Sequence, residues 1–473
     1  MTASGTGHIP FDSSFAKLPN TFFTRQDPVP VSNPEMLLFN HKLAVELGID
    51  PDWAQSPNGG SVFAGNQVAP ASTPLAQVYA GHQFGGWNPQ LGDGRAILLG
   101  EVIDNNGVRR DIQLKGSGRT PYSRGGDGRA WLGPVLREFV VSEAMHALGI
   151  PTTRALAAVA SGDMVQRETA LPGAVLTRVA SSHIRVGTFQ YFAARGDEES
   201  LQTLTDYAIA RHYPNAKGAL GLLKAVVANQ AELIASWMSV GFIHGVMNTD
   251  NMAISGETID YGPCAFMDDY HPDMRFSSID HQGRYAYSNQ PRVAPWNLAQ
   301  LANSLLSLMG PEGAAIAAAT DAIEGFSTQY EGHWLRRFGE KIGLKSATPD
   351  DRDLIERYLS GLAESGADFT NSFRDLLFDR VPENLGTWKS DWVVRRKIEG
   401  AQSLETMRRA NPSFIPRNHR IEAIIQSAVG GDLEPTKTLR KILASPFDDQ
   451  PDHDKYRAGP HADEVVQQTF CGT

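Results

Sequence analysis

The sequence predicts an α+β fold in two parts, a glycine-rich N-terminal half that contains strands and a mainly helical C-terminal half. Glycines concentrate between residues 81 and 133, among short runs that alternate as strands do. From about residue 215 the apolar residues recur at helical spacing. Of the 473 residues, 41% are hydrophobic and 20% are charged, which excludes wholesale disorder.

The elements follow from local signals. Residues 96–99 and 111–115 are strand-like, and the polar stretch that ends in Gly107 predicts a hairpin turn between them. A helix is expected over residues 134–148, with Pro134 near its start and Gly149 after its end. Periodicity predicts further helices over residues 220–240, 298–308, 314–323, 351–362 and 420–429.

Composition also limits the partners and the location. A net charge of −10 argues against a general nucleic-acid binder, because phosphate contacts need clustered cations. No apolar stretch approaches the roughly 18 residues of a membrane span, and no targeting pattern opens the chain. We therefore expect a cytoplasmic protein without nucleic-acid or membrane partners. Two cysteines exclude a disulfide framework and a four-cysteine zinc site.

The strongest motif is HGVMNTDNM over residues 244–252, which is followed by DYG at 260–262. His244 and Asn251 have the spacing of the protein-kinase pattern H-R-D-x-x-x-x-N, and Asp260 stands where D-F-G begins. The position of the kinase catalytic Asp holds Val246, so Asp250 is the nearest replacement for the base. The alternative is that these polar residues only cap turns.

Lys115 ends a strand-like run, and Glu138 follows 23 positions later on the predicted helix. Kinases use such a Lys–Glu pair to hold the nucleotide phosphates. Glu143 is a rival partner on the same helix, and we favour Glu138 because it lies nearer the helix start. A lone Lys at a strand end is otherwise usually a solvated residue.

Glycine-rich segments lie on both sides of the Lys115 strand. Glycines let backbone N–H groups approach phosphate oxygens, and arginines neutralise them, although many such segments are plain turns. Two further arginines, Arg178 and Arg185, are seven residues apart and would share one face if that stretch were helical. They form either a second anion pocket or surface ion pairs. His82 and His183 lack metal-ligand spacing and are expected to be structural or close to the substrate.

Together, four strings resemble the selenoprotein O (SelO, bacterial YdiU) family: YAGHQFG at 79–85, QLKGSGRTPYSR at 113–124, HGVMNTDNM at 244–252 and IDYGP at 259–263. The resemblance implies a protein-kinase-like two-lobed fold, historically labelled a pseudokinase. It also implies a protein adenylyltransferase that moves AMP from ATP to Ser, Thr or Tyr hydroxyls, with ATP flipped relative to ordinary kinases. UMP transfer to Tyr or His has also been attributed to bacterial members.

Carried over to this sequence, the resemblance assigns Asp250 as the proton acceptor and Lys115 with Glu138 as the ion pair. Asn251 and Asp260 look like ligands of Mg²⁺ or Mn²⁺. The nucleotide contacts would also include Asp260 and Lys115. The other expected contacts to ATP are Gly92, Gly94, Arg95, Asp127, Gly128, Arg178 and Arg185, the two last arginines forming the inverted phosphate pocket.

On this basis we divide the chain into an N-terminal extension (1–75), a kinase-like N-lobe (76–195), a helical C-lobe (196–445) and a tail (446–473). The polar segment 196–217 is the likeliest insertion at the boundary between the halves. Family members with selenocysteine carry it third from the C-terminus, where this chain has Cys471. The resemblance thus suggests redox control by a disulfide from the tail, for which Cys264 is the only intrachain partner. A buried, inert Cys264 with a free tail thiol and a mixed disulfide with another protein are the alternatives.

Three other functions stay open at this point. An ordinary phosphotransferase would need a base where Val246 stands. A non-catalytic nucleotide-binding scaffold would not need Asp250, Asn251 and Asp260 all present. UTP could replace ATP, since base selectivity depends on pocket shape. The protein substrates and the oligomeric state do not follow from the sequence.

Overall fold

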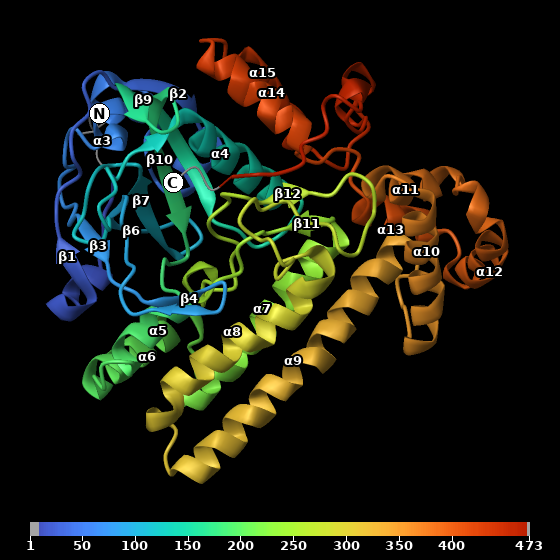
Figure 1. Cartoon of the computed structure of the whole chain (residues 1–473), viewed down its shortest axis with the longest axis horizontal. Helices are drawn as coiled ribbons and strands as arrows, with labels where there is room; N and C mark the ends of the chain where they lie inside the picture. The colour runs from blue at the N-terminus through green and yellow to red at the C-terminus, as the bar shows by residue number, and fades with distance from the viewer. Residues whose placement is uncertain (1–8, 471–473) are drawn as a thin grey trace, which may run out of the picture.

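A computed structural model describes residues 9–470 of the chain, and it confirms the α+β class. An antiparallel sheet in the strand order β1-β3-β6-β7-β10-β9-β2, with β8 paired to β10, lies toward one end of the molecule (Figure 1). The sheet strands are β1 (Phe23–Arg25), β2 (Glu35–Phe39), β3 (Leu75–Gln77), β6 (Ala96–Ile103), β7 (Arg109–Lys115), β8 (Ala130–Trp131), β9 (Arg154–Gln166) and β10 (Ala170–Ala180). Two short pairs lie apart from it, β4 (Gly81–Gln83) with β5 (Gly86–Asn88), and β11 (Phe242–Ile243) with β12 (Ala265–Phe266).

The predicted hairpin is confirmed as β6 and β7, and both strands are longer than expected. Asp104 makes the turn, because its Oδ1 accepts the N–H groups of Asn106 and Val108 at 2.9 Å. Glu101 and Asp111 lie in the buried middle of the two strands, where Arg211 pairs with both. The predicted part of β6 stops before Gly100 and the buried Glu101, and the predicted part of β7 starts at Asp111, after Arg109 and Arg110. These residues interrupt the apolar alternation on which the prediction rests.

Helix α4 (Leu132–Ala147) packs on β9 and β10. It begins two residues before the start that the sequence predicts. Helices α14 (Asn418–Val429) and α15 (Glu434–Leu443) return from the far end of the chain and pack on α4 (Figure 1). Arg440 of α15 lies over the ring of Phe139 on α4, at 4.4 Å. The last helices therefore help to fix the helix that carries Glu138.

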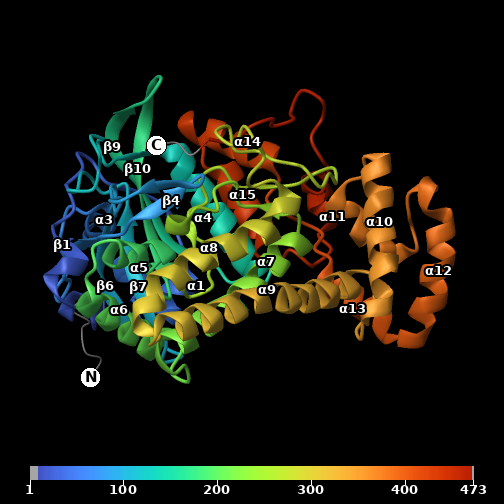
Figure 2. The same ribbon diagram turned by 60° about the horizontal axis from the view of Figure 1, so that its bottom comes forward.

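Three long helices run side by side below the sheet: α7 (Gly218–Ser239), α8 (Gln290–Leu305) and α9 (Glu312–Lys341) (Figure 2). Helix α9 is much longer than the ten residues predicted. Its buried stripe is narrow, with Ala315, Ala319, Ala322 and Phe326 spaced three or four residues apart, and the rest is mostly polar. Beyond α9 lie α10 (Arg352–Ser365), α11 (Phe369–Asp375), α12 (Gly386–Arg396) and α13 (Gln402–Ala410).

Helix α7 is long and apolar enough to cross a membrane by length and composition alone. More than half of its apolar window, 56%, is buried inside the protein. It packs against both α8 and α9. Burial against these neighbours explains its apolar composition as that of a core helix.

The polar segment 196–217 forms a helix that belongs to the fold. Asp197 caps α6 (Glu198–His212), and Leu201 and Leu204 are buried between α6 and its neighbours. Arg211, near its end, reaches Asp111 in the sheet at 2.5 Å. Helix α5 (Val186–Ala193) precedes it, and three short helices α1 (His41–Glu46), α2 (Pro51–Ala54) and α3 (Pro57–Ala64) lie in the N-terminal region.

Candidate functional site

A cavity of about 510 Å³ lies between the sheet and the segment from Val246 to Gly262. Its walls come from the loop before β6, the end of β7, the glycine-rich loop before β8, β10 and the loop after β11. All but one of the predicted site residues line it: Gly92, Gly94, Arg95, Lys115, Asp127, Gly128, Arg178, Arg185, Asp250, Asn251 and Asp260. Glu138 is the exception and lies behind Lys115.

Lys115 and Glu138 form the predicted ion pair. The Lys115 Nζ is 2.6 Å from Glu138 Oε2 and 3.1 Å from Asp260 Oδ1. Burial alone would raise the pKa of Glu138, but Arg178 and Lys115 outweigh it and hold that pKa below its usual value. Glu143, the rival, points away and binds Arg154 at 2.8 Å.

The sequence left open whether Arg178 and Arg185 share one face of a helix. They do not, because this stretch is not helical. Arg178 lies within β10, and Arg185 directly precedes α5, because the intervening residues form a strand end and a loop. The two side chains nevertheless converge on Asp260. Arg178 Nη2 is 2.6 Å from its Oδ1, and Arg185 Nη1 is 2.5 Å from its Oδ2.

Asp260 is therefore held by three cations. Its backbone has φ of 65°, a left-handed conformation that few non-glycine residues adopt. Burial would raise the pKa of its carboxyl, but Arg178, Arg185 and Lys115 hold that pKa well below its usual range. The whole cavity wall carries an excess of cations that favours an anionic ligand. Seven Lys and Arg side chains line it against four Asp: Arg95, Lys115, Arg124, Arg129, Arg167, Arg178 and Arg185 against Asp93, Asp127, Asp250 and Asp260.

Asp250 lies in a short 3₁₀ turn (Thr249–Asn251) at the other side of the cavity. Its Oδ2 accepts a hydrogen bond from Gln83 Nε2 at 2.9 Å, and its Oδ1 is buried without a hydrogen-bond partner. Burial raises the pKa of this carboxyl to about 6. Arg185 donates to its backbone carbonyl at 2.5 Å, which joins this turn to the cation cluster.

The neighbours of Asp250 have different roles. Val246 lines the cavity, so an apolar side chain stands where the kinase pattern has its base. Asn251 donates its side-chain N–H to the Val246 carbonyl at 2.9 Å, so its amide oxygen is the acceptor end of the side chain that this bond does not use. His244 is buried, and its ring contacts the Ile259 carbonyl at 2.8 Å. It thus positions the two loops of the site.

The glycine-rich loops need their glycines. A side chain at Gly92 would meet Tyr122 at 2.5 Å, and one at Gly128 would meet the Gly118 carbonyl at 2.1 Å. Both residues also have positive φ, of 89° and 68°. Asp127 binds Arg167 at 2.8 Å, so its carboxylate organises the rim of the cavity.

Sequence reasoning missed Gln83 and Tyr79, although both stand in the string YAGHQFG. Gln83 holds Asp250, and the Tyr79 ring lies 4.8 Å from the Arg185 guanidinium. The dense glycines around Gln83 were the available signal for a close approach of backbone to a site. His183 is buried against Asp111, and His82 contacts Gln190, so both are structural or flank the site.

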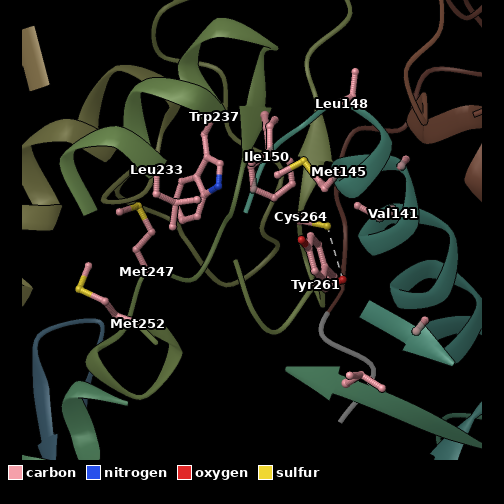
Figure 3. Close-up of a cluster of buried hydrophobic side chains, with 14 of the residues drawn as sticks. Val141, Met145, Leu148, Ile150, Leu233, Trp237, Met247, Met252, Tyr261 and Cys264 are labelled. Carbon is pink, nitrogen blue, oxygen red and sulfur yellow. Dashed lines mark hydrogen bonds between the residues drawn. The ribbon is translucent and has the colours of Figure 1, made fainter. Parts of the chain in front are cut away.

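Cys264 lies just beyond Asp260 and is buried, with its Sγ 3.5 Å from the Tyr261 carbonyl. Figure 3 shows Cys264 and Tyr261 facing Val141 and Met145 of α4. The tail crosses this region, because Thr469 donates its hydroxyl to the Pro263 carbonyl at 2.6 Å and pairs with Ser277. Cys471 itself is outside the residues that the structure describes, so its pairing stays a prediction.

Comparison with known proteins identifies relatives along nearly the whole chain. A family model described as protein adenylyltransferase SelO matches residues 7–444. A curated protein from Ruegeria sp. (strain TM1040), named protein nucleotidyltransferase YdiU, is 59% identical and covers 98% of this chain and 99% of its own. Proteins of the same name from Ruegeria pomeroyi and Rhodopseudomonas palustris (strain CGA009) are 58% and 53% identical, over 98% and 99% of this chain and 99% and 100% of theirs.

Proposed function

Because the chain belongs to the SelO family of protein adenylyltransferases and is a nucleotidyltransferase, we propose that it transfers AMP from ATP to Ser, Thr or Tyr hydroxyls of proteins. The observation that carries this proposal is Asp250, a buried carboxylate with one unpartnered oxygen in the same cavity as a cluster of three cations. A proton acceptor and an anion-binding cluster are the two parts that such a transfer requires.

In the proposed reaction Asp250 accepts the proton of the acceptor hydroxyl. The hydroxyl oxygen then bonds to the α-phosphorus, and the bond between that phosphorus and the bridging oxygen breaks to release pyrophosphate. Lys115, Arg178 and Arg185 stabilise the negative charge of the phosphates. ATP would lie flipped in a protein-kinase-like fold, so that its terminal phosphates occupy the arginine pocket.

Asn251 and Asp260 fit a divalent cation, because one amide oxygen and one carboxylate line the same cavity. No group of three or more His, Cys, Asp or Glu that could hold a metal occurs in residues 9–470. Magnesium often takes one or two protein oxygens and completes its shell with phosphates and water. Asn251 and Asp260 would hold Mg²⁺ or Mn²⁺, which when bound adds positive charge next to the phosphates.

Parallel reactions with α-labelled and γ-labelled ATP test the proposal directly. AMP transfer leaves label on protein only from the α position, and Asp250→Ala removes it. Label retained only from the γ position would show an ordinary phosphotransferase instead. Unchanged labelling in Asp260→Ala would refute the assignment of the metal and cation site.

UMP transfer from UTP is the second candidate, because the relatives are named nucleotidyltransferases without a specified nucleotide. Competition between ATP and UTP, with Mg²⁺ and with Mn²⁺, separates the two. A scaffold that binds a nucleotide without turnover would give no protein label from either nucleotide.

A further inference from the structure

Arg284 is a cation without a carboxylate partner beside the proposed acceptor site. Its side chain makes no ion pair with residues 9–470, and its Nε is buried without a hydrogen-bond partner. The guanidinium carbon lies 4.8 Å from the ring of Trp296 in α8 and 5.7 Å from that of Tyr285. The nearby Asp280 carboxylate is engaged with the backbone N–H groups of Arg284 and Tyr285, at 2.9 and 2.8 Å.

The hairpin of β4 and β5 lies between Arg284 and the Asp250 loop and contacts both. The guanidinium lies within 3.9 Å of where a side chain at Gly85, in the hairpin turn, would begin. The strand before the turn is tied to the Asp250 loop, because Gln83 binds Asp250 at 2.9 Å and the Phe84 N–H binds Asn248 at the same distance. The turn is tightly bent, with φ of 51° at Phe84 and 84° at Gly85.

Aromatic rings extend this surface. The His82 ring lies 4.9 Å from Trp87 and 5.3 Å from Trp296, and the Trp87 side chain is 42% exposed. Burial first, and then the charge of Arg284, lowers the pKa of His82, so this imidazole is neutral at pH 7. Arg284 is therefore the cation that contacts this surface, at the rings of Trp296 and Tyr285.

Arg284 does not serve the nucleotide phosphates. It is absent from the wall of the cavity, whereas Gln83 and Phe84 line that wall from the hairpin. The phosphates already have Lys115, Arg178 and Arg185 on the other side. An acceptor hydroxyl has to reach Asp250, and Arg284 lies on the hairpin side of the Asp250 loop, outside the wall of the cavity.

We propose that Trp87, Trp296 and Arg284, which we call the acceptor rim, bind an acidic side chain that flanks the modified hydroxyl of the acceptor protein. The inference rests on the proposed function. An Arg stacked on an aromatic ring presents its remaining N–H groups to a carboxylate, a charge-assisted contact that gains strength from partial desolvation. The rim thus selects acceptor segments rich in Asp or Glu.

Binding is tested without catalysis, using fluorescein-labelled copolymers of Glu and Tyr and of Lys and Tyr, followed by anisotropy. The wild type is expected to bind the acidic copolymer despite its net charge of −10, whereas that charge attracts the basic copolymer over the whole surface. The readout is therefore the change in affinity for the acidic copolymer on substitution. Arg284→Gln should weaken the acidic copolymer about tenfold, the size of one hydrogen bond to a charged group. Arg284→Lys should retain part of the binding, and Arg284→Glu should weaken the acidic copolymer more than Arg284→Gln does.

Arg409→Glu is the matched control, since Arg409 in α13 is highly exposed and remote from the hairpin. It should leave the affinity for the acidic copolymer unchanged. In labelling assays Arg284→Gln should raise the KM for the acidic copolymer with little change in kcat or in the affinity for ATP. Equal affinity of the wild type and Arg284→Gln for the acidic copolymer, or a loss of ATP affinity in Arg284→Gln, would overturn the rim. If binding follows the prediction but α-labelled ATP gives no product, the proposed function fails and the rim stands.

Discussion

Asp250 shows how the environment of one residue prepares it for chemistry. Burial raises its pKa to about 6, so the carboxylate is ionised at pH 7 yet basic enough to accept a proton. Gln83 occupies one oxygen and leaves the other without a partner. The same burial makes the ionised form unfavourable for folding, which is a common cost at active sites.

We predict that protein labelling falls as the pH drops below about 6, because protonated Asp250 cannot act as a base. Asp250→Asn should reduce labelling by a factor of about 10² to 10⁴ and keep ATP binding. The measurement is the initial rate of labelling between pH 5 and 8. Asp353→Asn, an exposed change on α10, is the control and should match the wild type. A flat rate over this pH range would contradict the role of Asp250.

Asp250 also affects stability. Its folded pKa is raised above the unfolded value of 3.8, so stability is lost as the pH rises through this window. Asp250→Asn should therefore raise the free energy of unfolding at pH 7 by about 1–3 kcal/mol. Urea unfolding at pH 4 and pH 7 measures this, and the gain should shrink at pH 4. An equal gain at both pH values would mean that charge burial is not its cause.

At the scale of elements, the glycine-rich loop before β8 offers a matched pair of substitutions. Gly125 and Gly128 both have positive φ, of 87° and 68°, so alanine is strained at each. Only Gly128 is also blocked, by the Gly118 carbonyl, whereas nothing lies within 4 Å of a side chain at Gly125. We predict that Gly128→Ala lowers ATP affinity about tenfold or more and Gly125→Ala much less, as measured by calorimetric titration. Similar losses of ATP affinity in both variants would show that backbone strain at positive φ, and not the contact with the Gly118 carbonyl, controls the conformation of this loop.

The end of α9 buries a lysine among aromatic rings. Lys341 is 2% exposed, and its Nζ lies 4.3 Å and 5.3 Å from the rings of Phe373 and Phe369. The rings favour the charged form by about 1–2 kcal/mol, but burial outweighs them and lowers the pKa of Lys341 to about 7.

Between pH 7 and 10 the unfolded chain therefore binds one proton more than the folded one at this position, and stability rises with pH. The free energy of unfolding should increase by about 2 kcal/mol from pH 7 to pH 9, and Lys341→Met should remove this increase. Urea titrations at several pH values measure it. Lys345→Met, at an exposed position nearby, should keep the wild-type dependence.

At the scale of the whole molecule, the C-terminal tail packs against the loop that follows Asp260. Thr469 is buried against Pro263 and Phe276, next to Cys264. We predict that a reductant raises labelling activity and that Cys471→Ser abolishes the response, because a bond from the tail would restrain this loop. Non-reducing mass spectrometry of the wild type and of Cys264→Ala should identify the partner thiol. Equal activity with and without reductant would exclude redox control by a disulfide from the tail.

Local patterns determined much of this protein. Spacing and residue type alone located the hairpin, α4, Lys115, Glu138 and the loop from His244 to Asn251, because turns, caps and periodicity are local properties. The length of α9 and the strand that carries Arg178 were missed. Both were missed because α9 has only a narrow buried face and β10 contains buried polar residues. Which of these residues are buried depends on neighbours that are distant in sequence.

Only the tertiary structure decided what each charge does. The sequence favoured Glu138 over Glu143 as the partner of Lys115, and the packing of α4 on the sheet brings the Glu138 carboxylate to 2.6 Å from the Lys115 Nζ. It placed Arg178 and Arg185 as a pair but not on Asp260, since that meeting needs β10, the start of α5 and the loop after β11 together. Side-chain chemistry is written in the sequence, whereas pKa values and partners depend on burial and on distances across the fold.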